Sequence, residues 1–256
     1  MGIAHQIHKE KILELRLELN DKNVFNFDSL AEIKEALIKY KTDTSFRVAL
    51  LTSGKKDFFS NGLDPKMFVG KSESETREFF TYLFEVIELF YKFPLPIISV
   101  ISGHCFGAAA VMAVLSDYRY MIQSNVRMCF PEINVGISFP AYVTLILKDL
   151  VGMQNARDLL FTGKMLKPDD AKEIGLVDEV YSSEELYNKA MKLAEKFLNT
   201  SYLSVTTIKM AMKEQYFPII DSVIKNDLNN LIMTSASPGG QEGFNAIVEN
   251  RRPKFK

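Results

Sequence analysis

The sequence predicts an α/β fold in which strands alternate with helices, followed by an all-helical C-terminal region. Two short apolar runs rich in β-branched residues, 47–52 and 96–102, have the composition of strands that are covered on both faces. Between them, residues 72–91 carry apolar side chains at helical spacing. Beyond about residue 184 every remaining pattern is helical. Alternating strands and helices are typical of layered α/β proteins.

The N-terminal part is expected to contain a strand, a turn and a helix. Leucines alternate with charged residues over 13–19, and this period of two predicts a half-buried strand. Asn20 and Asp21 then favour a turn. Residues 30–40 follow at helical spacing, and Ser29 with Glu32 has the spacing of a capping box, so a helix is expected to begin there.

The middle of the chain repeats strand, turn and helix. In the 72–91 helix, the stripe of Phe80, Leu83, Phe84 and Ile87 is more typical of core packing than of an aromatic binding site. The next segments are expected at 103–115, 118–122, 141–150 and 169–174, with a short strand near 176–180. Helices are then expected over 186–198, 205–215 and 219–235. We therefore predict a core of residues 1–198 and a helical region of residues 199–256.

Composition excludes several classes of protein. Of 256 residues, 47% are hydrophobic and 25% are charged, as in folded globular proteins. The formal net charge is -1, and no block of like charge precedes a short basic tail, so nucleic acid is not expected as a partner. No apolar run approaches the roughly 20 residues of a membrane-spanning helix, and no signal segment begins the chain. We expect a cytoplasmic protein with no membrane partner.

One motif resembles the catalytic elbow of a hydrolase. Residues 103–107, Gly-His-Cys-Phe-Gly, follow a strand and open a helix, as a nucleophile elbow does. There the activating histidine follows the nucleophile, whereas the histidines of this chain are His5, His8 and His104. His104 would also project to the side opposite Cys105 on an extended segment. We therefore interpret Cys105 as a small buried hydrophobic residue, and expect it and Cys129 to be reduced.

Other cofactor motifs are missing from the sequence. It contains no G-x-G-x-x-G, no G-x-x-x-x-G-K-[ST], and no cluster of cysteine and histidine at metal spacing. We expect no dinucleotide, no metal and no other cofactor.

Two strand-to-helix turns remain as candidates for chemistry. Residues 59–65 and 103–110 each offer backbone N–H groups without partners inside a helix, and two such donors can form an oxyanion hole. The second turn lies at the start of a helix, where the macrodipole also favours negative charge. Asp64 before Pro65 has the pattern of a helix cap, which we favour over a catalytic aspartate. Gly62 could serve turn geometry alone.

Three segments, in order and spacing, resemble the signatures of the crotonase (enoyl-CoA hydratase/isomerase) superfamily. They are RVALLTSGKKDFFSNGLD, PIISVISGHCFGAAAVMAVLSDYRYM and FPEINVGI. Residues 20–26 resemble the first turn of that family, FTGKMLKPDDAKEIGLVDEV its later helix and strand, and ENRRPKFK its usual ending. The resemblance therefore spans nearly the whole chain.

This resemblance implies a fold, an assembly and a set of site residues. The fold is a crotonase-like core of repeated ββα units with a C-terminal helical region that forms trimers, often paired into hexamers. The backbone N–H groups of Leu63 and Ala108 would hold the thioester oxygen of an acyl-coenzyme A. Substrate or coenzyme A contacts are expected from Val24, Ser60, Asn61, Gly62, Asp64, Lys66, Gly107 and Val111. Ala108 stands where glycine is commoner in the family, and a backbone donor survives that change.

The carboxylates depart from the pattern of the hydratases in this superfamily. Those enzymes carry one glutamate three residues after the second oxyanion donor and another in the P-E-[IV] segment. Here the first position is Val111, which can neither give nor take a proton, and Glu132 keeps the second. One carboxylate is enough for a 1,3-proton shift, and the single-glutamate pattern, with DYR and LILKDLVG, resembles the Δ3,Δ2-enoyl-CoA isomerases. An apolar pocket, with Phe130, Phe139, Tyr142 and Val111 as candidate walls, should raise the pKa of Glu132.

Two other interpretations stay open. The chain could be a hydratase or another acyl-CoA enzyme that has moved its second group elsewhere, for which Asp64, Glu73, Glu75 and Tyr142 are candidates. It could also be a catalytically silent acyl-CoA-binding trimer. Retention of Glu132 argues against the silent trimer, whereas Val111 slightly favours it.

Overall fold

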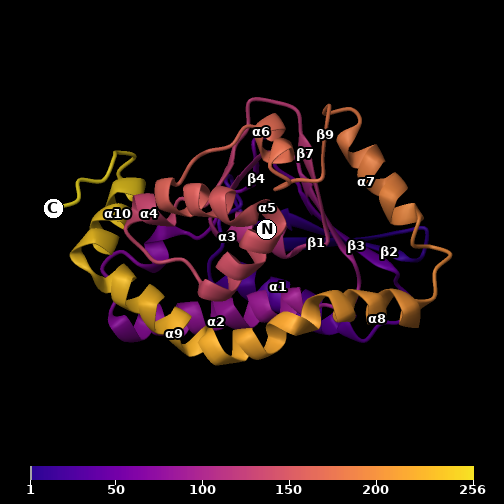
Figure 1. Cartoon of the computed structure of the whole chain (residues 1–256), viewed down its shortest axis with the longest axis horizontal. Coiled ribbons are helices and arrows are strands. Elements are labelled where there is room, and N and C mark those ends of the chain that lie inside the picture. Colours follow the sequence, from indigo (N-terminus) through magenta and orange to yellow (C-terminus); the bar gives the residue numbers. More distant parts are fainter. Residues whose placement is uncertain (1) are drawn as a thin grey trace.

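The computed structural model describes residues 2–256 and contains two β-sheets with helices around them (Figure 1). The larger sheet has the strand order β1-β2-β3-β5-β7-β9. Its strands are β1 Gly2–His8, β2 Ile12–Glu18, β3 Val48–Ser53, β5 Ile97–Ile101, β7 Tyr118–Ile122 and β9 Glu179–Tyr181. Only the β1–β2 pair in this sheet is antiparallel. The smaller sheet has the order β4-β6-β8 and is parallel, with β4 Phe58–Ser60, β6 His104–Phe106 and β8 Met128–Cys129.

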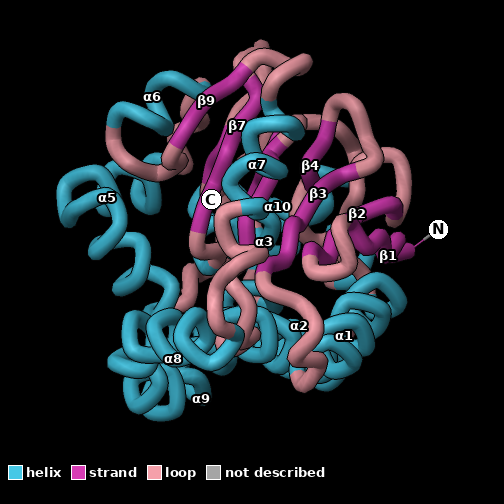
Figure 2. The backbone as a smooth tube through the Cα atoms, turned by 90° about the vertical axis from the view of Figure 1, so that its right-hand side faces the viewer, coloured by secondary structure: helices cyan, strands magenta, loops and turns pink. Residues whose placement is uncertain are grey.

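The helices cover both faces of the larger sheet. On one face α7, Leu186–Glu195, packs on β2, β3, β5 and β7 through small and aliphatic side chains. On the other face lies the main core, with α1 Phe27–Lys41, α2 Glu73–Tyr91 and α3 Ala108–Leu115. All five residues of β5 are buried because both faces are covered, as its apolar sequence predicts. Figure 2 shows α1 and α2 grouped beside α8 and α9, below the strands.

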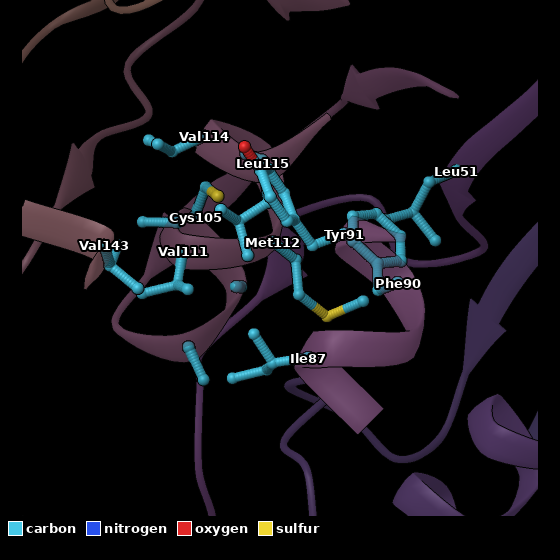
Figure 3. Close-up of a cluster of buried hydrophobic side chains, with 14 of the residues drawn as sticks. Leu51, Ile87, Phe90, Tyr91, Cys105, Val111, Met112, Val114, Leu115 and Val143 are labelled. Atoms are coloured by element: carbon cyan, nitrogen blue, oxygen red, sulfur yellow. The ribbon is translucent and has the colours of Figure 1, made fainter. Parts of the chain in front are cut away.

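Every residue of α3 is buried, and this short helix is central to the core. Figure 3 shows its side chains among those of α2, β3 and α5, with Ile87, Phe90, Leu51 and Val143 around Val111, Met112 and Leu115. A helix that is apolar on all sides has no freedom to rotate toward water. Its first turn is therefore held in a fixed position, which matters for the site below.

The strand expected over 13–19 is confirmed, with its leucines buried and Arg16 and Glu18 partly exposed, but Glu14 departs from the expected alternation. Glu14 is fully buried and accepts hydrogen bonds from the hydroxyls of Thr52 (2.7 Å) and Tyr187 (2.8 Å). Its other contacts are His8, at 2.7 Å, and Arg16, at 3.1 Å. Tyr187 belongs to α7, so this helix helps to bury Glu14, which sequence alternation assigns to solvent.

The first helix begins earlier than the sequence predicts, because a different residue caps it. Asn26 is the N-cap, and its side chain accepts from Ser29 N while the Ser29 hydroxyl accepts from Asn26 N. Ser29 is therefore the last residue of the capping box (N3) rather than its first. Glu32 instead accepts a hydrogen bond from Ile3 N, at 2.6 Å, which ties the helix to β1.

The remaining elements agree with the prediction except at particular ends. Ser72 caps α2, as its position implies. The 103–110 turn also contains β6, α5 extends over Ala141–Thr162 and bends at Gly152, and α6 spans Pro168–Glu173. β9 begins three residues later than expected, because Leu176 and Val177 form a buried turn that bonds to Ala171 O. The elements not predicted are β1, β4, β8, the one-turn helix α4 Glu132–Val135, and α10. The helix start expected at Pro65 is the 3₁₀ turn η1 Pro65–Met67.

The regular elements after β9 are all helices in the described chain, as predicted. After α7 it contains α8 Tyr202–Lys213, the 3₁₀ turn η2 Glu214–Tyr216, α9 Phe217–Ala236 and α10 Pro238–Val248. No described helix is long and apolar enough to cross a membrane. The division between residues 198 and 199 stays a prediction.

Candidate active site

The first of the two turns is held in place by the loop that precedes α1. Phe25 N donates to Gly62 O at 2.8 Å and Asp64 N donates to Phe25 O at 2.9 Å, so the residues on both sides of Leu63 are fixed. Gly62 has φ +81°, a conformation that glycine adopts without strain. Val24 lies in the same loop, where its N–H donates to Asn20 Oδ1 at 3.0 Å.

Asn23 supports this turn and was not identified from the sequence. It is fully buried, and its side-chain amide donates to Leu17 O, Ser53 Oγ and Phe59 O. The backbone carbonyl of Asn23 accepts a hydrogen bond from the Ser60 hydroxyl at 2.6 Å. The φ of Asn23 is +49°, a conformation that asparagine tolerates better than most residues, so an asparagine in the turn after β2 is the local signal that the sequence offered.

Three predicted contact residues flank this turn. The backbone N–H of Asn61 donates to Lys22 O at 3.0 Å. Asp64 is the N-cap of η1, and its carboxylate accepts from Lys66 N at 3.0 Å, which confirms the capping interpretation. The side chain of Lys66 is exposed on η1.

The second turn lies beside the first because β4 and β6 are paired in parallel. Phe58 is opposite His104 and Ser60 is opposite Cys105, so both strands end at the same edge. Gly107 follows with φ 53°, donates its N–H to Cys129 O at 3.1 Å, and leads into Ala108, the first residue of α3. Cys105 is fully buried, and burial raises the pKa of its thiol, in agreement with its interpretation as a buried apolar residue.

The two turns are in contact at Gly62. A Cβ atom added to it would lie 2.7 Å from Phe106 O and 3.5 Å from Ala108 N. The amides of Leu63 and Ala108 are therefore neighbours in space. Within residues 2–256 neither N–H donates a hydrogen bond, and the one at the start of α3 has no intrahelical acceptor.

Glu132 is brought to the same edge by the third strand of the small sheet. β8 pairs with β6, with Cys129 opposite Phe106, and α4 begins at Glu132 three residues later. A Cβ atom added to Gly107 would lie 3.6 Å from Glu132 Oε1, so the carboxyl faces the turn that carries Ala108. The absence of a side chain at Gly107 leaves this approach open.

The carboxyl of Glu132 is desolvated and incompletely paired. The residue as a whole is only half-buried, but its Oε2 atom is enclosed and has no hydrogen-bond partner in the described chain. Burial raises the pKa of Glu132 to about 7, and a hydrogen bond from its own backbone N–H opposes this shift. A carboxyl with such a pKa can both take up and release a proton near neutrality.

Val111 is one turn into α3 from the Ala108 amide. It is buried, and its N–H donates to Gly107 O at 2.9 Å. Phe130 and Phe139 meet edge to face at 5.5 Å, and Tyr142 is buried at the start of α5. Among the described residues, no group of three or more histidine, cysteine, aspartate or glutamate side chains is arranged to hold a metal ion.

The two glutamates of α2 that were considered as a second catalytic group, Glu73 and Glu75, are bonded to residues in or next to that helix. Glu75 completes the capping box with Ser72 and pairs with Lys71 at 2.9 Å. Glu73 is exposed and pairs with Arg77 at 3.0 Å.

The last helix, α10, joins the two segments that flank the site, and it was not predicted. Gln241 accepts from Gly70 N and donates to Phe68 O, while the ring of Phe244 stacks on Phe68 at 4.5 Å. A Cβ atom added to Gly243 would lie 1.9 Å from Val135 O in α4. The helix therefore contacts both η1, after the first turn, and α4, which begins with Glu132 (Figure 1).

Together these features are suited to proton transfer beside a polarised carbonyl. Two free, adjacent amides can stabilise negative charge on an oxygen, and an adjacent carboxyl can exchange a proton with the same molecule.

The sequence is similar to proteins of one known family along nearly its whole length. The sequence model of the enoyl-CoA hydratase/isomerase family matches residues 8–256. The chain is 31% identical over 234 residues to a crotonyl-CoA hydratase of Syntrophomonas wolfei, covering 91% of this chain and 89% of that protein. It is 26% identical over 260 aligned positions to a carnitinyl-CoA dehydratase of Salmonella enteritidis, covering 98% and 97%. The chain therefore belongs to the enoyl-CoA hydratase/isomerase family and is an enzyme of that family.

A solved structure supports the same fold. Human mitochondrial Δ3,Δ2-enoyl-CoA isomerase superposes with a TM-score of 0.90, covering 97% of each chain at 22% identity. The crotonase-like α/β fold inferred from the sequence is confirmed.

Proposed function

We propose that this protein is a Δ3,Δ2-enoyl-CoA isomerase, which moves a double bond within an acyl-CoA thioester. One observation carries the choice. A desolvated carboxyl, Glu132, faces the turn of the oxyanion donors, whereas Val111 is aliphatic where the hydratases of the family carry a second glutamate.

The proposed mechanism uses one acid–base group and two amides. The thioester oxygen accepts hydrogen bonds from the N–H groups of Leu63 and Ala108. The Glu132 carboxylate removes a proton from C2 of a 3-enoyl thioester, and the resulting negative charge delocalises onto the oxygen. The same carboxyl then returns the proton to C4, so that the double bond ends between C2 and C3. No atom is gained or lost, and no cofactor enters the reaction.

The electrostatics of the site suit this assignment. Burial raises the pKa of Glu132 to about 7, so its carboxylate can act as a base near neutrality. General acid–base catalysis of this kind raises a reaction rate by about 10²–10⁴-fold. The N-terminal end of α3 adds a favourable dipole at the thioester oxygen. Hydration needs a second group that positions and activates water, and the aliphatic Val111 cannot supply it.

The substrate contacts and the assembly belong to the same proposal. Backbone groups of Val24, Asn61, Gly62 and Gly107 would contact the thioester and the adjacent part of coenzyme A, and exposed Lys66 would reach its phosphates. The side chains of Ser60 and Asp64 are already bonded within the turn, so they would contribute by shaping it. We further propose a cytoplasmic homotrimer, or a hexamer made from two trimers.

Hydration is the second candidate function, because a relative at 31% identity is a crotonyl-CoA hydratase. A two-substrate assay separates the candidates. Purified protein should convert 3-hexenoyl-CoA to the 2-trans isomer, seen as rising absorbance of the conjugated thioester, and should hydrate crotonyl-CoA slowly. Faster hydration than isomerisation would overturn the isomerase proposal. Tight acyl-CoA binding with neither reaction would instead identify a silent binding protein.

A further inference from the structure

The helix that begins at Glu132, α4, is too short to fix its own geometry. It has four residues, and its N-cap, Pro131, provides no side-chain hydrogen bond. Isolated helices this short are not stable in water. The Oε2 atom of Glu132 also has no hydrogen-bond partner in the described chain. Contacts that hold the surrounding backbone therefore have to fix the direction of the carboxyl.

The backbone that follows α4 turns back to Glu132. Residues 136–142 lead from α4 into α5, and within them Ile137 N donates to Glu132 O at 3.1 Å. The N–H of the next residue, Ser138, donates to the hydroxyl of Thr234 on α9 at 3.0 Å. Thr234 therefore holds the amide that directly follows the one bonded to Glu132.

A second residue of α9 holds the other end of the 136–142 segment. Asp227 accepts hydrogen bonds from Ala141 N at 2.9 Å and from Tyr142 N at 3.4 Å, in the first turn of α5. The N-cap of α5 is Pro140, which provides no side-chain cap, so Asp227 caps this helix from another element. Asp227 and Thr234 are about two helical turns apart, so they lie on one face of α9.

The burial of Asp227 is unfavourable for stability. The residue is 4% exposed, and burial raises its pKa, against the effect of the bonds from Ala141 N and Tyr142 N. The positive end of the α5 dipole offsets part of this cost. A buried carboxylate without a cationic partner usually destabilises a fold, and such exceptions are expected where a site needs a fixed geometry. The contacts of Asp227 therefore suggest a role beyond folding.

The 136–142 segment also carries an aromatic side chain that packs beside the candidate base. Phe139 lies between the two contacts with α9, and its ring meets that of Phe130, two residues before Glu132, edge to face. Just beyond the segment, Figure 3 shows Val143 among the buried side chains of α3, the helix that begins at Ala108. Movement of this segment would therefore change the surroundings of the carboxyl and of α3 together.

We infer that Asp227 and Thr234 are positioning residues, which hold the 136–142 segment so that the Glu132 carboxyl faces the substrate. The inference rests on the proposed isomerase function, and neither side chain touches the substrate or transfers a proton. α9 then belongs to the catalytic architecture as well as to the region expected to form the assembly. A misplacement of about 1 Å in a reacting group can lower a rate about 100-fold, so loss of either contact should be visible in kcat.

Two substitutions of Thr234 provide the first test. Thr234→Val keeps the shape of the side chain without the hydroxyl, whereas Thr234→Ser keeps the hydroxyl. Thr234→Val should lower kcat for 3-hexenoyl-CoA at least tenfold and change the affinity for octanoyl-CoA, a saturated thioester, less than threefold; Thr234→Ser should retain most of kcat. Ser222→Ala, which removes an exposed hydroxyl bonded within α9, is the control and should leave kcat unchanged. Wild-type kcat in Thr234→Val, or equal losses in the valine and serine variants, would refute the positioning role.

Substitutions of Asp227 test the second contact. Asp227→Asn keeps an oxygen that can accept from the α5 amides and should retain most of kcat, whereas Asp227→Ala should lower kcat at least tenfold at nearly unchanged octanoyl-CoA affinity. Asp221→Ala, at an exposed position of α9, is the matched control. Wild-type kcat in Asp227→Ala, or a parallel loss of octanoyl-CoA affinity, would count against the inference. The Thr234 variants still decide the question if Asp227→Ala does not fold.

Hydrogen exchange separates this inference from the proposed reaction. The Ile137 amide bonds to Glu132 O, so its exchange rate reports on the end of α4 without any need for catalysis. Ile137 should exchange at least tenfold faster in Thr234→Val than in the wild type, and at the wild-type rate in Ser222→Ala. Unchanged exchange at Ile137 in Thr234→Val would overturn the inference, even in a protein that isomerises 3-hexenoyl-CoA. Faster exchange in a protein without isomerase activity would refute the proposed function, while the coupling of α9 to α4 stands.

Discussion

Replacing Glu132 with glutamine should lower turnover and raise stability in the same protein. The substitution keeps the shape of the side chain and removes its charge. Burial raises the pKa of Glu132 from 4.5 to about 7, so the folded state holds this proton more tightly than the unfolded state does. That difference corresponds to about 3 kcal/mol.

The sign of the pH dependence follows from the raised pKa. Below the ordinary pKa of a glutamate the side chain is neutral in both states, and its burial has no charge-related cost. As the pH rises to the folded-state value of about 7, the unfolded state ionises first and the wild type loses about 3 kcal/mol of stability. The glutamine variant has no charge to bury and loses none of this stability. Its free energy of unfolding relative to that of the wild type should therefore increase from about pH 4.5 to about pH 8.

The measurement is equilibrium unfolding of both proteins at these two pH values. The stability advantage of the variant over the wild type should increase by about 3 kcal/mol between them, or roughly 6–12 °C in melting temperature. Comparing two pH values cancels any constant effect of the amide. Glu173→Gln, at an exposed position of α6, is the control and should show no such increase.

Turnover should change in the opposite direction. Glu132→Gln should lower kcat for 3-hexenoyl-CoA by about 10²–10⁴-fold while acyl-CoA binding persists. Wild-type kcat should fall as the pH drops below about 7, since the base must be ionised. If the stability of Glu132→Gln relative to the wild type does not vary with pH, the carboxyl is not desolvated. If the variant keeps wild-type turnover, Glu132 has no role in the mechanism.

Three further substitutions test the surroundings of the carboxyl. Val111→Glu should increase crotonyl-CoA hydration about tenfold or more, at a cost of a few kcal/mol for a buried acid; unchanged hydration in the folded variant would count against the role assigned to this position. Gly62→Ala should abolish most isomerase activity, because its Cβ would meet a carbonyl oxygen of the second turn at 2.7 Å, whereas Gly70→Ala, also at positive φ but with open space, should cost only stability; equal kcat losses would contradict the contact. Gly243→Ala should lower kcat more than acyl-CoA affinity, because its Cβ would displace the helix that begins at Glu132, whereas Gly239→Ala makes only ordinary contacts; crystal structures of both variants would show whether that helix has moved.

The sequence predicted the groups of this candidate site but not all of the residues that surround it. Local patterns located both turns and the cap at Asp64, since each depends on residues close together in the chain, whereas only the family resemblance singled out Glu132. Family spacing then related these segments to one another. Glu132 by itself, a glutamate after a proline, would have been assigned to the surface.

Tertiary contacts decided what the local patterns could not. α7 covers the second face of β2 and buries Glu14, which alternation assigns to solvent, because period two describes a strand and not what packs on it. α10 contacts α4 and η1 through a glycine and a stacked aromatic ring, a fit that exists only once segments far apart in sequence have met. The pKa of Glu132 likewise follows from its enclosure in the folded chain. Sequence determined which groups are present and where the chain turns, whereas desolvation and close approach depend on long-range packing and were decided by the tertiary structure.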